Sequence, residues 1–365
     1  MLASLRRVLA VTVVAGALVA GTGAAAVAQR GPDAAGRAAP SLSWELTPTG
    51  STARLRGLSV VSRTVAWASG TGGTVLRTTD GGATWASVGP PGTSTLQFRD
   101  IEATSDRHAV ILSIGSGAES RIYVTDDGGA SWTVAFQNPE DSPAFYDCMA
   151  FTTPQRGLAL SDPVDGVFRL QETTDGGHTW SLVDPAGMPP AQGTEFAFAA
   201  SGTCLTAGQG QTTYLGTGGI DPPRIFVSKD RGHTWSVTTA PLIGGPSAGV
   251  FSVRFRDRHN GIAVGGDFAN PTSALGNAAW SSDGGITWRP ASVLPAGYRS
   301  GSAWLPQERD VALAVGPSGS DVTTDAGRTW SPFDSGSFDS VDCSSDGACW
   351  ASGEQGRVAN LLVSR

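Results

Sequence analysis

The 365-residue sequence predicts an all-β protein built from repeated four-stranded sheets, and three observations support that prediction. A short turn that ends in tryptophan recurs six times along the chain. Each repeat holds four short runs rich in Val, Leu, Ile and aromatic residues, separated by glycine-rich or polar turns, which is typical of strands. No helical periodicity of useful length follows the apolar N-terminal run, and the 49 glycines fit a turn-dense body. Four strands in each unit predict the blades of a β-propeller.

The recurring turn is first found as TTDGGATW at residues 78–85, and successive tryptophans are 42 to 55 residues apart. The later copies are VTDDGGASW, ETTDGGHTW, VSKDRGHTW, SSDGGITW and TTDAGRTW. A catalytic loop is needed once, whereas a structural turn is needed once per module, so we interpret these turns as scaffold. The structural residues are Asp80, Trp85, Asp127, Trp132, Asp175, Trp180, Asp230, Trp235, Asp283, Trp288, Asp325 and Trp330.

Each residue type in this aspartate turn has a physical role. We expect the aspartate to accept hydrogen bonds from backbone N–H groups further along the turn, which closes it. The glycines supply positive φ at no steric cost. The tryptophan begins the outer strand and offers a large apolar ring that packs between blades. Two copies depart from the pattern, with Arg231 and Ala326 at the position where the others have glycine.

The number of blades is predicted from the two ends of the chain. After Trp330, the stretch ACWASGEQGRV aligns with VAWASGTGGTV of the first repeat, and the chain ends before another aspartate turn. Residues 43–46, SWEL, resemble TWSL at residues 179–182 but have no blade before them. We therefore predict a seven-bladed β-propeller closed by the N-terminal strand, which pairs the two ends and removes exposed sheet edges. Six blades is the alternative.

The N-terminus has the pattern of an export signal. A short positive segment, MLASLRR, precedes an apolar run that ends in small residues, which predicts a signal peptide at residues 1–28, cleaved before Gln29. Residues 29–41 are predicted to be a disordered linker and residues 42–365 the propeller. The alternative is an uncleaved membrane anchor. After cleavage we expect no membrane span and a secreted, periplasmic or cell-envelope location.

Charge and cysteine content restrict the partners and the redox state. The formal net charge is −7 and no run of basic residues occurs, so we predict no nucleic-acid partner. Four cysteines in an exported chain are candidates for disulfides. Cys343 and Cys349 flank a tight turn between two expected strands, and Cys148 and Cys204 would pair if neighbouring repeats bring them together. The alternative for each pair is a buried free thiol.

No cysteine or histidine spacing in the sequence matches a metal site, and we expect no metal and no cofactor. Two histidines occupy the variable position of the aspartate turn, where other copies have alanine or isoleucine, so we interpret the histidines as surface residues without a metal role. The four are His108, His178, His233 and His259.

The loops of a propeller divide between two faces, and this division predicts a binding site. Turns from second to third strands share one face with the connections between blades, whereas the aspartate turns lie on the opposite face. Polar residues on the first face should converge at the mouth of the central channel. We expect Arg224 and Arg299 to recognise an anion there; the alternative is that the candidates pair with one another. The candidates are Asp162, Glu195, Arg224, Ser247, Asp267, Tyr298, Arg299, Ser320 and Asp321.

The aspartate turns resemble the Asp-box, or bacterial neuraminidase repeat (BNR), of pattern S/T-x-D-x-G-x-T/S-W, over residues 43–365. Sialidases, xyloglucan hydrolases, sortilin-like receptors and assembly factors share that motif. Longer stretches, among them RGLSVVSRTVAWASGTGGTVLRTTDGG, LALSDPVDG, SAGVFSVRFRD and AVGPSGSD, resemble the photosystem II stability/assembly factor-like propellers. The exported branch in non-photosynthetic bacteria, often labelled oxidoreductase, is the most similar. This resemblance implies a seven-bladed propeller outside the cytoplasm that acts by binding.

Three classes of function follow. The first is a monomeric, non-catalytic binding or assembly module, whose partner is an envelope protein, a carbohydrate or a small anionic ligand. The second is a glycoside hydrolase that uses carboxylates on the face opposite the aspartate turns, such as Asp162 with Asp267, or Glu195. A sialidase is disfavoured, because it would need an early Arg-Ile-Pro and a tyrosine nucleophile, whereas the Arg-Ile at Arg224 lies mid-chain and the sequence has only four tyrosines. The third is an oxidoreductase, for which no dinucleotide fingerprint or haem spacing is found. No catalytic residue is assigned.

Overall fold

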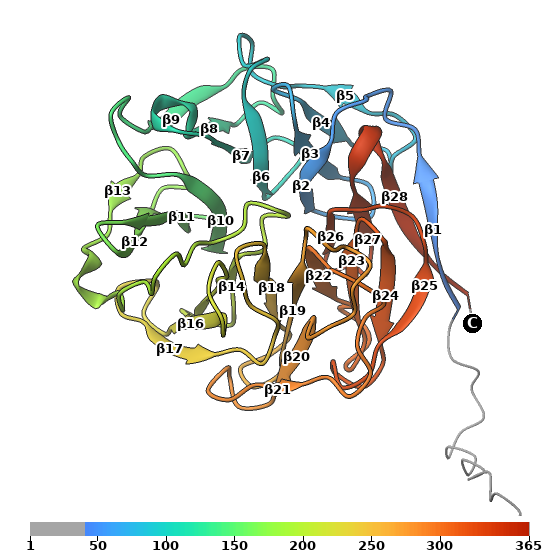
Figure 1. The fold of residues 1–365 in the computed structure, drawn as a ribbon. Helices are drawn as coiled ribbons and strands as arrows, with labels where there is room; N and C mark the ends of the chain where they lie inside the picture. The colour runs from blue at the N-terminus through green and yellow to red at the C-terminus, as the bar shows by residue number, and fades with distance from the viewer. Residues whose placement is uncertain (1–40, 365) are drawn as a thin grey trace, which may run out of the picture. The chain divides into compact units, whose positions relative to one another are not determined.

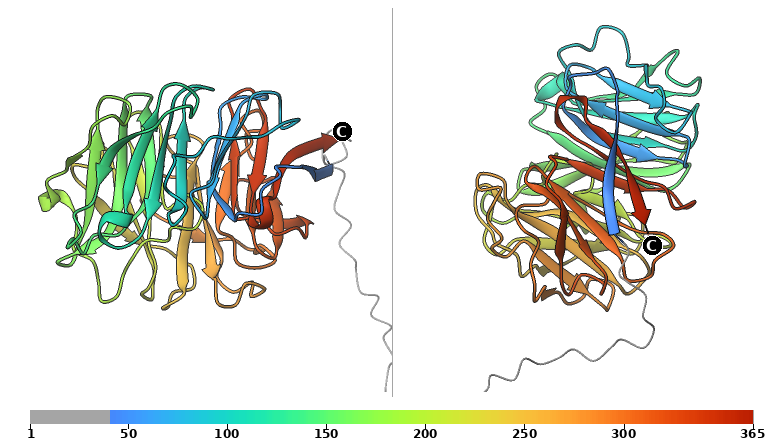
Figure 2. Two further views of the ribbon diagram at one scale, coloured as in Figure 1. Left: turned by 90° about the horizontal axis from the view of Figure 1, so that it is seen from above. Right: turned by 90° about the vertical axis from the view of Figure 1, so that its right-hand side faces the viewer.

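The computed structural model describes residues 41–364, which form a closed ring of seven four-stranded antiparallel sheets (Figure 1). The predicted seven-bladed β-propeller is confirmed, and the six-bladed alternative is wrong. Viewed from the side, the strands of each blade run between the two faces of the ring (Figure 2). The predicted signal peptide and nearly all of the predicted linker lie outside the described residues. Within residues 41–364, no helix has the length and apolar character needed to cross a membrane.

Six blades have their strands in chain order. Blades one to three consist of β2 (Leu55–Val60), β3 (Ala66–Gly70), β4 (Val75–Thr78) and β5 (Ala86–Ser87); β6 (Gln97–Ala103), β7 (Ala109–Ile114), β8 (Arg121–Thr125) and β9 (Thr133–Gln137); and β10 (Tyr146–Thr153), β11 (Arg156–Val164), β12 (Val167–Thr173) and β13 (Ser181–Leu182). Blades four to six consist of β14 (Leu205–Ala207), β15 (Thr213–Gly216), β16 (Arg224–Ser228) and β17 (Ser236–Thr239); β18 (Ala248–Phe255), β19 (Gly261–Asp267), β20 (Ala278–Ser281) and β21 (Arg289–Pro290); and β22 (Gly301–Trp304), β23 (Ala312–Gly316), β24 (Gly319–Thr323) and β25 (Ser331–Asp334). The first strands of neighbouring blades contact one another around the ring and form its inner wall. Three short 3₁₀ turns complete the described elements: η1 (Gly117–Glu119), η2 (Pro185–Gly187) and η3 (Glu354–Gly356).

Blade seven joins the two ends of the described chain. Its strands, in order from the centre, are β26 (Ser340–Cys343), β27 (Cys349–Ser352), β28 (Val358–Ser364) and β1 (Ser41–Thr47). The N-terminal strand β1 therefore lies beside the C-terminal strand β28, as Figure 1 shows, with Trp44 opposite Leu361. The indole of Trp44 donates a hydrogen bond to the Ser320 hydroxyl of blade six at 3.0 Å. This contact ties the closing strand to the neighbouring blade as well as to its own.

Replacing Trp44 with alanine is expected to lower the free energy of unfolding by about 2–3 kcal/mol, because a half-buried aromatic ring is lost from the closing strand. The ring packs on Phe333 and Phe338, with centroids 5.8 and 5.4 Å away. Denaturant unfolding measures the change. The adjacent Glu45 is exposed, so Glu45→Ala should stay within about 0.5 kcal/mol of wild type. Equal stability of the two variants would show that β1 does not close the ring.

The six aspartate turns share one hydrogen-bond network, which the first copy illustrates. Asp80 Oδ1 accepts hydrogen bonds from the Thr78 hydroxyl at 2.8 Å and from the Thr84 backbone N–H at 2.9 Å, and Asp80 Oδ2 accepts the Thr84 hydroxyl at 2.6 Å. The Thr78 hydroxyl in turn accepts the N–H of Gly82. These bonds, led by the one from the Thr84 hydroxyl, lower the pKa of Asp80. The aspartates thus stabilise their own turns by accepting hydrogen bonds within them.

In the turn of blade one, only the second glycine is required by packing between blades. A Cβ on Gly82 would lie 2.9 Å from the Trp350 ring of blade seven, whereas a Cβ on Gly81 would meet nothing closer than 3.5 Å. In this turn the first position therefore has room for a side chain, provided that the residue adopts positive φ. Arg231 and Ala326 do so, with φ of 62° and 60°. This explains why those two turns depart from the pattern at that position.

Each interface between blades buries its own apolar core. The turn tryptophans contribute to these cores, as expected: Trp132 lies edge-on to Trp67 of blade one, with centroids 6.5 Å apart, and its N–H donates to the Val88 carbonyl at 2.7 Å. Both cysteine pairs form disulfides in the structure, Cys148–Cys204 between blades three and four and Cys343–Cys349 within blade seven. Packing is thus continuous around the ring.

Candidate functional site

A cavity of about 440 Å³ opens on the face of the ring opposite the aspartate turns. Its walls come from first strands and the segments that lead into them, and from residues at or beyond the ends of second strands. Phe145, for example, precedes β10, and Phe268 follows β19. This is the face on which the sequence predicts a binding site.

Four β-bulges supply side chains to this cavity. In blades one, two, three and five the pairing between first and second strand skips one residue, which leaves that residue unpaired. A bulge bends its strand and changes the direction of the side chain there. The skipped residues are Arg56, Arg99, Asp147 and Phe251, and all four line the cavity. The same local irregularity therefore builds much of the inner wall of the site.

Arg54 and Arg56 stand on one side of the cavity with a single carboxylate between them. Arg54 holds Asp339 through two hydrogen bonds of 2.8 and 2.6 Å, from Nε and Nη2. Arg56 Nε lies 3.8 Å from the nearer oxygen of the same carboxylate, which is too far for a hydrogen bond. Burial lowers the pKa of Arg56, with further lowering from Arg54. One carboxylate thus faces two guanidinium groups.

Arg99 brings a third guanidinium group to the same wall. It donates to the Ala199 carbonyl and to the Gln97 side chain, both at 2.9 Å. Burial, followed by repulsion from Arg56 and Arg54, lowers its pKa to about 10, so it stays charged at neutral pH. The Nε atoms of Arg56 and Arg99 are buried and have no hydrogen-bond partner among the described residues. Because a guanidinium group can only donate, these two atoms call for an acceptor.

Two neighbouring carboxyl groups, Asp147 and Asp162, complete the polar wall. Burial and the neighbouring Asp162 raise the pKa of Asp147 well above its usual range. Burial raises the pKa of Asp162 to about 6, while its Oδ1 accepts the Ala197 N–H at 2.9 Å. Both shifts favour the protonated form, and Asp162, with its pKa of about 6, is mostly ionised at neutral pH. Three guanidinium groups therefore share this wall with three carboxyl groups, two of which have raised pKa values, so the cavity favours an anionic ligand.

Aromatic rings form the other wall. Phe198 stacks on Phe251 with centroids 3.7 Å apart, and Tyr298 meets Phe251 edge-on at 4.7 Å. Phe268 lies edge-on to both phenylalanines at 6.3 Å and is 51% exposed. A large exposed ring beside a buried aromatic cluster is typical of a surface that contacts a ligand. The cavity therefore offers an apolar wall opposite a cationic one.

Of the nine candidates named from sequence, Asp162 and Tyr298 line the cavity. Two buried ion pairs account for four others. Arg224 is paired with Glu195, which also accepts the Thr217 hydroxyl at 2.6 Å. Arg299 donates from Nε to Asp321 at 2.6 Å, and the two side chains are 1% and 0% exposed.

The other three candidates also have partners. The Ser247 hydroxyl donates to Asp267 at 2.7 Å, and Ser320 accepts the Trp44 indole. The structure thus pairs seven of the nine within the chain, as the alternative interpretation expected. A ligand-binding role for Arg224 and Arg299 stays a prediction.

The sequence reasoning missed the residues that give the cavity its charge: Arg54, Arg56, Arg99, Asp147 and Asp339. The nine candidates named from sequence were expected in loops and at strand ends, whereas Arg56, Arg99 and Asp147 lie inside first strands. A signal was available, because LRGL, FRDI and YDCM each place a charged residue within a run that should line the channel. Aligning the first strands of blades one to three would have brought these positions together.

Comparisons with known proteins support the fold. No model of a protein family matches the sequence, and no curated protein matches it. Among solved structures, YCF48 bound to D1 peptide shares 16% identity at a TM-score of 0.61, covering 87% of this chain and 96% of that one. YCF48 from Cyanidioschyzon merolae shares 15% at 0.62, covering 87% and 98%. The GH74 xyloglucanase from Xanthomonas campestris shares 16% at 0.58, covering 87% of this chain and 53% of that one. These similarities establish the propeller fold.

Proposed function

We propose that this propeller is a non-catalytic binding module whose central cavity holds a peptide segment that carries a carboxylate and an apolar side chain. The observation behind the proposal is that three arginines, Arg54, Arg56 and Arg99, line one cavity, where Asp339 is the only carboxylate among the described residues that makes a hydrogen bond or ion pair with any of them. A carboxylate satisfies such donors through charge-assisted hydrogen bonds. The aromatic wall formed by Phe251 and Phe268 would take the apolar side chain. A volume of about 440 Å³ suits a few residues of a peptide.

A peptide is favoured over a carbohydrate for two reasons. A neutral sugar brings no negative charge to the three guanidinium groups, whereas a carboxylate does. One of the similar propellers is a peptide complex, YCF48 bound to D1 peptide, which supports the same class of ligand for this fold. The partner that we propose is accordingly a protein of the cell envelope that presents an acidic chain end or loop.

The proposal is tested with labelled hexapeptides that end in an aromatic or aliphatic residue, made with either a free C-terminal carboxylate or a C-terminal amide. We expect fluorescence anisotropy to show binding of acids and at least about tenfold weaker binding of the matched amides, because the amide loses the charge. Amidated peptides with an internal aspartate or glutamate test whether the cavity binds a side-chain carboxylate, as a loop would present, rather than the carboxylate of a chain end. Equal affinity for acid and amide, or no binding by any acidic peptide, would contradict the proposal.

Binding of such a peptide is expected to tighten by about tenfold when the pH falls from about 7.5 to about 5. Asp162, with its pKa raised to about 6 by burial, gains a proton over this range and loses its negative charge. Arg99, with its pKa of about 10, stays charged throughout. A peptide carboxylate remains ionised at pH 5. Anisotropy titrations at several pH values measure the change.

Asp162→Asn is the matched variant for this pH dependence, because asparagine keeps an oxygen for the Ala197 N–H. Its affinity should be nearly independent of pH and close to that of the wild type at pH 5. Affinity that weakens on acidification, or a wild-type pH dependence retained by the variant, would show that Asp162 does not set the charge of the cavity.

We also propose that the chain is exported after cleavage before Gln29, and that its repeated turns are Asp-box turns of the photosystem II assembly factor-like propellers. The hydroxyl–aspartate–hydroxyl network of Thr78, Asp80 and Thr84 supports the second point. N-terminal sequencing of the protein recovered from the envelope or medium tests the first. A mature chain that begins at Gln29 is expected, and an intact Met1 terminus would favour the anchor instead.

A glycoside hydrolase is the second candidate, favoured by one observation: Asp147 and Asp162 line the cavity and have raised pKa values, as an acid catalyst requires. Hydrolysis of chromogenic glycosides that is abolished by Asp162→Asn would support it. Absence of turnover across neutral and acidic glycosides, together with peptide binding, would leave the binding module as the function.

A further inference from the structure

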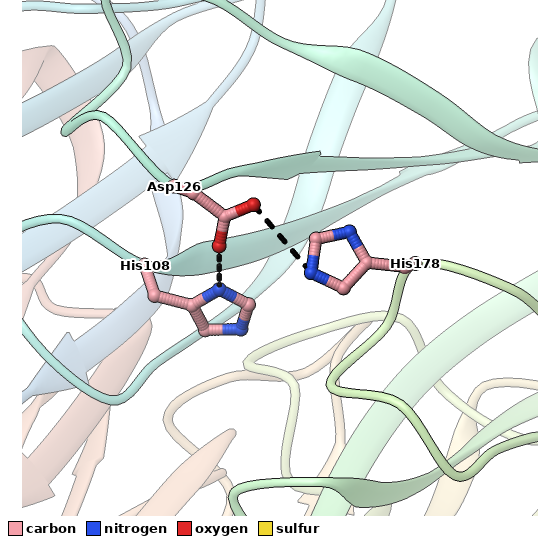
Figure 3. Close-up of side chains that lie close together, drawn as sticks. All are labelled: His108, Asp126 and His178. Atoms are coloured by element: carbon pink, nitrogen blue, oxygen red, sulfur yellow. Dashed lines mark hydrogen bonds and ion pairs between the residues drawn. The ribbon is translucent and has the colours of Figure 1, made fainter.

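Three side chains with metal-binding atoms lie together on the face of the aspartate turns, away from the cavity. His108 Nδ1 is 2.8 Å from Asp126 Oδ1, and His178 Nε2 is 3.5 Å from Asp126 Oδ2 (Figure 3). One atom from each of the three residues lies within 4.8 Å of the other two. The side chain of His108 is 18% exposed, that of His178 43% and that of Asp126 62%, so the cluster opens to solvent. Its imidazole and carboxylate groups converge from two blades.

The scaffold does not require these side chains. In the turn of blade two, Asp127 makes the structural hydrogen bonds to the Thr125 and Ser131 hydroxyls, and Asp126 is an additional acid beside it. His178 occupies the variable position of the turn in blade three, which is alanine in blades one and two, histidine in blade four, isoleucine in blade five and arginine in blade six. His108 ends the loop between β6 and β7. The hydrogen-bond networks of the turns in blades two and three are therefore complete without these three side chains.

We propose that His108, Asp126 and His178 form a binding site for a divalent transition metal ion of the zinc class, which links blades two and three. Two imidazoles and one carboxylate suit Zn²⁺, Ni²⁺ and Cu²⁺, and leave further coordination positions open to water. Ligand atoms about 2.0–2.1 Å from a tetrahedral ion are roughly 3.3 Å apart. The imidazoles lie 2.8 Å from Oδ1 and 3.5 Å from Oδ2 of the one carboxylate, on either side of this value, so binding one ion needs the side chains to turn toward it.

The interpretation of the histidines from sequence changes accordingly. His108 and His178 are 70 positions apart and belong to different repeats, so their spacing resembles no metal motif. The propeller places the blade-three turn against the blade-two loop, where a Cβ on Gly176 would lie 3.6 Å from the His108 ring. His108 is half-buried at this contact rather than a free surface residue. The site exists only once the two blades pack.

The test uses the tag-free full-length chain, titrated with Zn²⁺ by calorimetry and with Co²⁺ by visible absorption spectroscopy. We expect one equivalent of metal to bind, d–d bands of a nitrogen–oxygen site to appear with Co²⁺, and Zn²⁺ to raise the melting temperature, because the ion binds only the folded form. His108→Ala, Asp126→Asn and His178→Ala should each weaken Zn²⁺ binding at least about tenfold.

His233→Ala is the matched control, because His233 holds the position of His178 in the next turn. Among the described residues, its acidic neighbour is Glu172, at 3.9 Å. That variant should bind Zn²⁺ as the wild type does. Circular dichroism checks that the three ligand variants remain folded without metal. Wild-type affinity in His108→Ala or His178→Ala, or loss of binding in His233→Ala alone, would overturn the proposal. So would the absence of stoichiometric binding by the wild type.

Discussion

Replacing Arg299 with methionine is expected to lower the free energy of unfolding by about 3–5 kcal/mol, because it leaves a buried carboxylate without its countercharge. Arg299 is 1% exposed and donates to Asp321, to the Tyr298 carbonyl and to the Ser318 hydroxyl, the last two at 2.9 Å. Asp321 is itself fully buried. Equilibrium unfolding in denaturant measures the loss.

Two further variants show that the loss belongs to the ion pair. Arg107 is exposed, so Arg107→Met should change stability by no more than about 0.5 kcal/mol. The double variant Arg299→Met with Asp321→Leu removes both charges and should recover most of the stability. If Arg299→Met is nearly as stable as wild type but no longer binds the peptide, then Arg299 has the ligand role predicted from sequence, and our assignment of the pair is wrong.

Replacing both Arg56 and Arg99 with glutamine is expected to weaken binding of the carboxylate peptide at least about 100-fold. A hydrogen bond to a charged group contributes about 1.5–3 kcal/mol, and two such bonds are lost, at about 1.4 kcal/mol for each factor of ten. Stability should change little or rise, because burial and repulsion already lower the pKa of both guanidinium groups. Anisotropy titration and denaturant unfolding of the same preparation measure the two effects.

Arg63→Gln is the matched control for this double variant. Arg63 is an exposed arginine of the loop between β2 and β3, on the face of the aspartate turns, where it donates to the Asp346 carbonyl. We expect it to leave peptide affinity unchanged. Equal weakening by Arg63→Gln and by the double variant would mean that overall charge, rather than the cavity, determines binding.

The ring could be predicted from sequence because its determinants are local and repeated. The turn of Asp80 and its five copies fixed the strand spacing, and the likeness of SWEL to TWSL located the closing strand at Trp44. The second glycine of each turn, as at Gly82, is set by contact with the preceding blade. Each of these signals depends on residues that are close in the sequence or on the repeat itself.

The sites could not be predicted in the same way, because they depend on departures from the repeat. The direction of Arg56 and Arg99 follows from bulges, which alternation of apolar and polar residues does not reveal. Arg299 carries the same charge as Arg56 and lies on the same side of the ring, yet it is neutralised by a carboxylate that only the fold brings near. Likewise, His108 meets His178 only across the boundary between two blades.

Amide hydrogen exchange with and without a bound carboxylate peptide tests the central claim most directly. We predict protection of the segments that build the cavity, residues 54–58, 97–101 and 196–200, with no change in the six aspartate turns. Protection confined to the aspartate turns, with the cavity segments exchanging as in the free protein, would contradict the assignment of the cavity as the binding site.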